Sequence, residues 1–236
     1  MFLKTSLDAT LALHEIKQLG FYRYTKFISQ DEAEEVSSAL LRFADSADRS
    51  TLEINYEGSE MRIWNAQLRI PEIFSLYSRL KLLNRILFND ASEFCILAIL
   101  TKNTPQSCHS NRWHVDSLSA QYKFFLHLSN VTDQDGQFEF IPKSHTVISR
   151  LFFCLRYPFV YLRPSMRGIK RAYRSISDAK IPPLPSRNQF LCSSGDLLVA
   201  DVRMLHRDSP CSADGSRVAL HCYLGVDPRR FPGFHS

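Results

Sequence analysis

The sequence predicts a mainly β protein with flanking helices, of the α+β class, built around a sandwich or barrel of short strands. Three observations support this prediction. Apolar residues at helical spacing fill the first ninety positions, alternating segments separated by turn residues follow from position 94, and 44% of the 236 residues are hydrophobic. This composition is ample for a core, and the length suits one domain, which we expect over 1–236.

The N-terminal part, over 1–90, is expected to be a mainly helical support. Residues 6–19 form a helix that Gly20 can end. The sequence SQDE at 29–32 is a capping box that opens a second helix. Pro71 suits the first turn of a third helix, where its missing N–H costs nothing. The spacing predicts the inner face of that helix to be Ile73, Leu76, Leu80, Leu83 and Leu87.

Strands are predicted from position 94 onward, after a short one at 21–24. They cover 94–100, 121–128, 138–141, 197–200 and 217–224. The first is a continuous apolar run, which is typical of a buried strand. The second alternates, so that Lys123, Phe125 and His127 share one side of the strand. Short strands with turns between them favour a sandwich or barrel.

Three side chains are candidate metal ligands. His114 and Asp116 stand two residues apart, so in an extended segment they point to the same side. That pair alone is a weak signal, because such pairs are common by chance. His206 ends a segment that begins with a Gly-Asp turn, and it could add a second imidazole. Two imidazoles and a carboxylate on one face of a metal form the facial triad of non-haem Fe(II) oxygenases, which leaves positions open.

Arg217 strengthens this hypothesis. It stands eleven residues after His206, at the start of the alternating strand over 217–224. A dicarboxylate bound to the metal would need a cation at its far end. A guanidinium can bind a carboxylate through two parallel hydrogen bonds, so Arg217 is the candidate for that contact.

The same segments resemble the phytanoyl-CoA dioxygenase family of Fe(II)/2-oxoglutarate oxygenases. The resemblance covers about 94–145 and 190–225, and GFYRYTKFISQDEAEEV matches more loosely. It implies a double-stranded β-helix, a jelly-roll or cupin-like core, over those two ranges. The stretches that carry it are RWHVDS, QYKFFLHLSNVTDQDGQFEFIPKSH and SGDLLVADVRMLHRDSPCSADGSRVALHCYL.

The resemblance also implies roles for individual residues. His114, Asp116 and His206 would bind Fe(II), and Arg217 would hold the distal carboxylate of the co-substrate 2-oxoglutarate. Lys123 would lie near the co-substrate, the alternative being a lysine at a strand edge that faces solvent. With O₂, such an enzyme releases succinate and CO₂ and hydroxylates a small molecule. Since Asp116 occupies the carboxylate position, no site is left for chloride, and hydroxylation is favoured over halogenation.

Two positions depart from the family pattern. Lys143 stands where the family has a glycine, so this turn cannot rely on a glycine with positive φ. Asp208 follows His206 by two residues, where a small hydroxyl residue is commoner. An extra acid there is unfavourable for an anionic co-substrate unless it points away or meets Arg203 or Arg207.

A basic insertion or lid is predicted over 146–189, where the strand pattern is interrupted. Nine Lys or Arg residues and one acidic residue lie between 146 and 190, a net charge of +8, while the rest of the chain carries −3. This local charge favours an anionic, carrier-linked or lipid-linked substrate, with peripheral membrane or carrier contact through 150–187, and no nucleic-acid partner is expected. The alternative is a solvated basic helix with a structural role.

Two other function classes stay open. A cupin-like metal enzyme without redox chemistry would not need 2-oxoglutarate; Arg217 and the His-x-Asp order argue against it. A binding protein could instead act through the basic segment over 146–190. Its binding would be sensitive to salt and would survive His114→Ala, because electrostatic binding does not need the metal.

Cysteine usage and the N-terminus indicate a cytoplasmic protein. The six cysteines are scattered and form no CxxC pair, as expected for reduced thiols. The first fifteen residues include Asp8 and Glu15 and lack the sustained apolar stretch of a signal peptide. No apolar run reaches the length of about eighteen residues that a membrane span needs.

Overall fold

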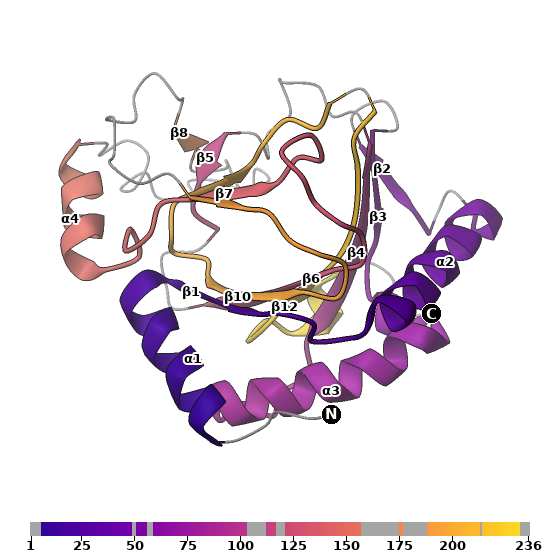
Figure 1. The fold of residues 1–236 in the computed structure, drawn as a ribbon, viewed down its shortest axis with the longest axis horizontal. Helices are drawn as coiled ribbons and strands as arrows, with labels where there is room; N and C mark the ends of the chain where they lie inside the picture. The colour runs from indigo at the N-terminus through magenta and orange to yellow at the C-terminus, as the bar shows by residue number, and fades with distance from the viewer. Residues whose placement is uncertain are drawn as a thin grey trace.

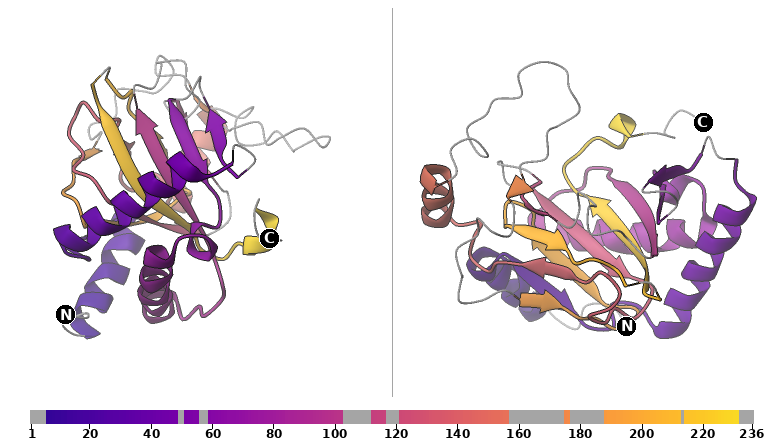
Figure 2. Two further views of the ribbon diagram at one scale, coloured as in Figure 1. Left: turned by 90° about the vertical axis from the view of Figure 1, so that its right-hand side faces the viewer. Right: turned by 90° about the horizontal axis from the view of Figure 1, so that it is seen from above.

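Two antiparallel sheets face each other in the computed structural model, and helices cover the outer face of the larger sheet (Figure 1, Figure 2). This arrangement confirms the predicted fold class, which is mainly β with flanking helices and a jelly-roll core. The structure describes residues 6–48, 51–55, 59–102, 112–116, 121–156, 175–176, 188–212 and 214–231.

The larger sheet has seven strands and the smaller has five, and all described strand pairs are antiparallel. The order in the larger sheet is β1 (Phe21–Tyr24), β10 (Leu197–Asp201), β6 (Tyr122–His127), β12 (Ser216–Tyr223), β4 (Cys95–Lys102), β3 (Glu60–Ile63) and β2 (Glu53–Asn55). The order in the smaller sheet is β8 (Ser175–Ile176), β5 (Trp113–His114), β11 (His206–Asp208), β7 (Phe138–Phe140) and β9 (Asn188–Phe190). The predicted strands are present, and β2 and β3 extend the larger sheet into the region expected to be mainly helical.

The helices of the N-terminal part begin and end where their sequences predict. The N–H of Gly20, at φ +97°, closes the first helix on Ile16 O at 3.0 Å. Ser29 Oγ accepts the N–H of Glu32 at 3.1 Å, which is one half of the capping box. All five residues of the predicted inner face of the third helix are buried. The helices are α1 (Ser6–Leu19), α2 (Gln30–Ser46) and α3 (Pro71–Phe88), and two short 3₁₀ turns are η2 (Ala66–Leu68) and η5 (Pro228–Arg230).

Alternation along the strands divides the core into two parts. Phe124 and Leu126 of β6 are fully buried in a cluster that includes the inner faces of all three helices. Phe125, between them, packs with Phe138 and Phe140 in a second cluster between the sheets. Every second residue of β6 therefore enters the space between the sheets. The predicted alternation is confirmed, and it points polar as well as aromatic side chains into that space.

Gly195 fixes the start of β10, the strand that leads toward His206. Its φ is +89°, and a Cβ there would lie 2.4 Å from the carbonyl oxygen of Ile28. Its N–H donates to His127 O at 2.8 Å, and its own carbonyl accepts from the N–H of Ile28 at 3.2 Å. Only glycine fits this close backbone approach without strain.

The turn at Lys143 keeps a positive φ although a lysine occupies it. Its φ is +63°, in the left-handed region that costs a residue with a Cβ free energy. The backbone holds it there, because the Lys143 N–H donates to Leu19 O at 3.0 Å and the Thr146 N–H donates to Lys143 O at 3.1 Å. The turn therefore retains the glycine-like conformation without the glycine.

Lys143→Gly should stabilise the protein by about 0.5–1 kcal/mol, because relief of the left-handed strain exceeds the added entropy of the unfolded chain. Urea unfolding measures this. Lys17→Gly is the matched control, an exposed lysine inside α1, where glycine should cost about 1 kcal/mol instead. A Lys143→Gly protein that is no more stable than wild type would show that the turn is unstrained.

The predicted insertion begins with α4 (Val147–Arg156), at the left of Figure 1. Most of the remaining insertion or lid predicted over 146–189, namely 157–174 and 177–187, lies outside the described residues. No helix in the described part of the chain is long and apolar enough to span a bilayer. Four apolar side chains of α4 are exposed: Val147, Ile148, Leu151 and Leu155.

Candidate metal centre

The structure brings the three predicted ligands together. His114 and His206 are cross-strand partners of β5 and β11 in the smaller sheet. Asp116 follows β5, where its N–H donates to Val202 O at 3.1 Å. The ligand atoms of the three side chains all lie within 4.8 Å of one another, although ninety positions separate Asp116 from His206. The pairing of two short strands thus creates the cluster.

Both imidazoles present the same nitrogen to the carboxylate. The Nε2 atoms of His114 and His206 lie 3.5 and 3.7 Å from Asp116 Oδ1. On the other side of each ring, Nδ1 faces a backbone carbonyl, that of Arg112 at 2.7 Å and that of Met204 at 2.8 Å. A carbonyl only accepts, so each Nδ1 carries a hydrogen, which leaves Nε2 as the ring nitrogen that can bind a metal. This donor set fits a divalent metal between the two Nε2 atoms and Oδ1.

Protonation states also fit a metal site. Burial lowers the pKa of His114, and the neighbouring His206 lowers it further, so the His114 ring is neutral at neutral pH. Burial alone would raise the pKa of Asp116, but the Lys123 ammonium and the two imidazoles hold it well below its usual range. A neutral imidazole and an ionised carboxylate are the forms that bind metals.

Lys123 faces the interior. Its side chain is 8% exposed, and Nζ donates to Asp116 Oδ2 at 2.6 Å while lying 4.0 Å from the centre of the Tyr223 ring. Burial acts to lower the pKa of Lys123, but Asp116 outweighs it and raises that pKa. The alternative of a solvent-facing lysine is therefore wrong. The two oxygens of Asp116 have separate partners, with Oδ1 toward the imidazoles and Oδ2 on Lys123.

Arg217 enters the same space from β12 and is already paired. Its side chain is 4% exposed, and Nη1 donates to the carbonyl of Gly136. Nη2 lies 3.0 Å from Asp208 Oδ2 and Nη1 lies 3.3 Å from Asp208 Oδ1, so both ends of the guanidinium fork meet the carboxylate. The predicted cation for the co-substrate thus has an internal anion as its partner.

Asp208 therefore has a partner that the sequence analysis did not foresee. The expectation was that it points away or meets Arg203 or Arg207. Arg203 instead pairs with Asp201, and Arg207 pairs with Glu139 on the other face of the smaller sheet, at 2.6 Å. Each of those two arginines is held by a nearer carboxylate, which leaves Asp208 to Arg217.

Two more imidazoles lie between the sheets, and both are neutral. His127 is 3% exposed, and neither ring nitrogen has a hydrogen-bond partner among the described residues. Burial, followed by Arg217, lowers its pKa to about 3. The same two causes hold the pKa of His221 well below its usual range. His145 lies elsewhere, with Nε2 donating to Lys17 O at 3.1 Å.

Formal charges cancel around the triad. Asp116 and Lys123 form one neutral pair, Asp208 and Arg217 form another, and the His114 and His127 rings are uncharged. A divalent cation on the triad would give this group a net charge of +2. The space between the sheets would then favour a ligand with two negative charges.

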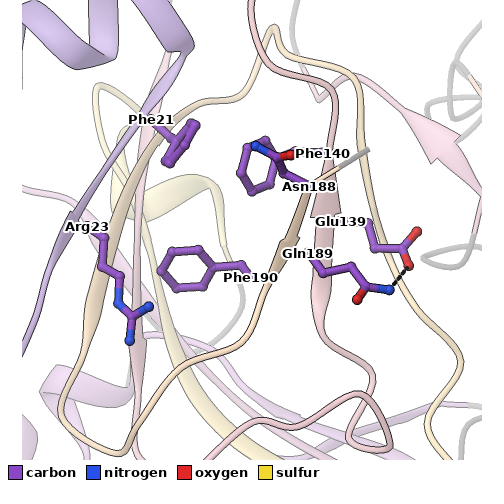
Figure 3. A pocket seen from close by; sticks show the side chains of 7 residues that line it. All are labelled: Phe21, Arg23, Glu139, Phe140, Asn188, Gln189 and Phe190. Carbon is purple, nitrogen blue, oxygen red and sulfur yellow. Dashed lines mark hydrogen bonds between the residues drawn. The ribbon is translucent and has the colours of Figure 1, made fainter. Parts of the chain in front are cut away.

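A cavity of about 530 Å³ lies where β1 of the larger sheet approaches β7 and β9 of the smaller (Figure 3). Figure 3 shows aromatic rings on one side and the Gln189–Glu139 hydrogen bond on the other. One residue of its lining, Phe140, is the cross-strand neighbour of the candidate ligand His206. Sequence reasoning missed this cavity, because its residues come from separate strands without a shared motif. They are Phe21, Arg23, Glu139, Phe140, Asn188, Gln189 and Phe190.

Solved structures share this architecture, whereas no protein-family model matches the chain and no curated protein matches its sequence. The epimerase SnoN of nogalamycin biosynthesis, in complex with Fe³⁺, alpha ketoglutarate and nogalamycin RO, matches with a TM-score of 0.68 and 15% identity over 98% of this chain and 93% of its own. HygX from Streptomyces hygroscopicus, with nickel and 2-oxoglutarate bound, matches with a TM-score of 0.60 and 16% identity over 90% and 85%. A Pseudomonas putida prolyl-4-hydroxylase gives 0.59 and 12% over 91% and 97%.

The chain shares their fold. Because the sequence identities are low, the likeness concerns the path of the backbone alone, and it covers most of the length of both chains. It supports the jelly-roll core that the two facing sheets define.

Proposed function

We propose that this chain is a non-haem iron dioxygenase that uses Fe(II), 2-oxoglutarate and O₂ to oxidise a small molecule. One observation carries the proposal: His114 and His206 present their Nε2 atoms to the same carboxylate oxygen of Asp116, while each Nδ1 donates to a backbone carbonyl. The fold shared with SnoN and HygX, whose structures hold a metal and 2-oxoglutarate, supports it. The motif order further supports kinship with the phytanoyl-CoA dioxygenase family.

Different residues would bind the metal and the co-substrate. The two Nε2 atoms and Asp116 Oδ1 would hold the metal on one face and leave its other face open. Lys123 holds Asp116 Oδ2, which keeps the carboxylate bound through one oxygen. Arg217, which is buried between the sheets, would be the cation that binds the distal carboxylate of 2-oxoglutarate. When bound, iron and 2-oxoglutarate supply the oxidising chemistry and release succinate and CO₂.

The net charge agrees with that co-substrate. The described charges around the triad cancel, so Fe(II) adds two positive charges and the two carboxylates of 2-oxoglutarate neutralise them. A dianion in a space between two sheets is costly unless opposite charges compensate it. The site therefore suits metal and dianion together better than either alone.

For the reaction outcome and the substrate we propose hydroxylation of a small, anionic or carrier- or lipid-linked molecule. Asp116 fills the carboxylate position, which argues against halogenation. Some solved structures of this fold are named epimerase and carbocyclase. The shared fold therefore does not select hydroxylation, and the proposal of hydroxylation rests on the residues of this chain. Small molecules occupy some of those structures, namely nogalamycin RO and hygromycin B. The net charge of +8 over 146–190 favours an anionic substrate, and the scattered cysteines favour the cytoplasm.

An anaerobic titration with Fe(II) and 2-oxoglutarate tests the proposal. We expect the visible charge-transfer band of the chelate in the wild-type protein and no band in His206→Ala. Arg217→Ala should need more 2-oxoglutarate for the same band, because the distal carboxylate loses its cation and Asp208 is left beside it as an unpaired negative charge. His14→Ala, at an exposed position of α1, is the matched control and should behave as wild type.

The outcomes separate the function classes. A folded wild-type protein that gives no band would rule out the oxygenase. Metal binding that depends on His206, without binding of 2-oxoglutarate, would favour the cupin-like enzyme without redox chemistry. Binding of anionic partners that persists in His114→Ala would favour the protein acting through the segment over 146–190.

A further inference from the structure

The guanidinium of Arg217 has an internal carboxylate where a ligand carboxylate would bind. Two Arg217 nitrogens meet the two oxygens of Asp208 at 3.0 and 3.3 Å, which is the side-by-side geometry that arginine also uses for carboxylate ligands. Asp208 stands two residues after His206 in β11, so both side chains point into the space between the sheets. The aspartate thus shares one face of β11 with the candidate ligand His206 and contacts the candidate co-substrate cation.

The side chains of Arg217 and Asp208 differ in how firmly their surroundings hold them. The Arg217 side chain is 4% exposed and is also fixed by the carbonyl of Gly136. The Asp208 side chain is 22% exposed and lies at the end of a three-residue strand. When a second carboxylate approaches, Arg217 stays in place and Asp208 can turn toward solvent. Asp208 is therefore the part of the pair that a ligand can displace.

We propose that Asp208 is an internal competitor of the co-substrate, and that it sets a weak affinity for 2-oxoglutarate. This inference rests on the proposed function. A bound 2-oxoglutarate must replace one carboxylate on Arg217 with another, so the gain from its distal carboxylate is the difference between two similar contacts.

The same exchange of carboxylates on Arg217 also reduces the discrimination between 2-oxoglutarate and 2-oxo acids that lack the distal carboxylate. With a free guanidinium, a 2-oxo acid that lacks the distal carboxylate leaves a buried charge unpaired and is strongly rejected. With Asp208 available, that ligand leaves the ion pair intact. We therefore expect the wild-type protein to prefer 2-oxoglutarate over 2-oxopentanoate by less than about tenfold, since most of the charge-assisted contact is already satisfied.

The test measures binding rather than turnover. The Fe(II)-loaded protein is titrated without oxygen, with 2-oxoglutarate and separately with 2-oxopentanoate, for wild type, Asp208→Asn and Asp133→Asn. Asp208→Asn keeps the shape and removes the charge, and it should bind 2-oxoglutarate about 10- to 100-fold more tightly, as expected when a charge-assisted contact becomes available. Its affinity for 2-oxopentanoate should not rise. Asp133→Asn removes an exposed carboxylate of the β6–β7 connection and should match wild type.

Each outcome decides. Equal affinities for 2-oxoglutarate in wild type and Asp208→Asn would overturn the inference and leave the proposed function standing. Metal binding without 2-oxoglutarate binding in both proteins would overturn the two together. If Asp208→Asn does not fold, the inference can still be tested with Asp208→Ser and by comparing the affinities of the wild-type protein for 2-oxoglutarate and 2-oxopentanoate. A wild-type preference for 2-oxoglutarate above about 100-fold would show that Arg217 is fully available.

Discussion

Asp116→Ala should abolish tight metal binding and also destabilise the metal-free protein by about 3 kcal/mol. The metal would lose the one carboxylate of the described triad, which should lower affinity by at least about 100-fold, more than the loss of a supporting contact. The stability loss has a separate cause. The substitution leaves the Lys123 ammonium, 8% exposed, without the carboxylate that lies 2.6 Å away.

Controls separate these two effects. Lys123→Met combined with Asp116→Ala removes both charges, so it should recover most of the stability and none of the metal affinity. Glu139→Gln breaks an ion pair of similar burial with Arg207 on the other face of the sheet, so it should lose stability but keep metal binding. Urea unfolding and calorimetric titration with a divalent metal measure both quantities. Asp116→Ala that binds metal like wild type would mean that the triad is not the metal site.

The elements that the sequence predicted best are those with a strong local signal. Period-two alternation located β6 and β12, and the periodic leucines located α3. The cluster of His114, Asp116 and His206 was also predictable, although it depends on contacts across ninety positions. Alternation decides which side each residue faces, and the order of the motifs supplied the pairing of distant segments.

Short and polar elements gave no such signal. The strands β2 and β3 have three and four residues and carry charged side chains at several positions. In the sheet β3 pairs with β4 and β2 pairs with β3, and no local pattern encodes this pairing. Lys143 illustrates the same limit, because backbone hydrogen bonds hold a conformation that the lysine itself disfavours.

Ion-pair partners could be predicted only in part. Alternation alone separates Arg207 from Asp208, because adjacent residues of a strand face opposite sides. Indeed, Arg207 lies directly across from Glu139 in β7. Pairing of Asp208 with Arg217 requires that β11 of one sheet faces β12 of the other, a relation that depends on how the sheets pack. Asp208, which we propose as the internal competitor of the co-substrate, was therefore the residue whose partner sequence reasoning left open.

His127→Leu should stabilise the metal-free protein, by about 1–3 kcal/mol at neutral pH, because it removes a buried ring whose nitrogens have no hydrogen-bond partner among the described residues. The gain should grow as the pH falls. Burial and then Arg217 lower the pKa of His127 to about 3, and Asp196 opposes this less strongly. Asp208 also favours the charged ring, and Arg23 disfavours it.

The sign follows from linkage. Because its folded-state pKa lies below the value of about 6.5 in the unfolded chain, His127 costs stability as the pH falls from 6.5 toward 3, where only the unfolded chain takes up the proton. Between pH 7 and pH 5 the advantage of His127→Leu should therefore widen by roughly 2 kcal/mol. Urea unfolding at both pH values measures this, with the exposed His14→Leu as the control whose difference from wild type stays constant. A His127→Leu protein less stable than wild type at both pH values would mean that the imidazole makes a stabilising contact, and its 2-oxoglutarate affinity would then show whether that contact belongs to the ligand site.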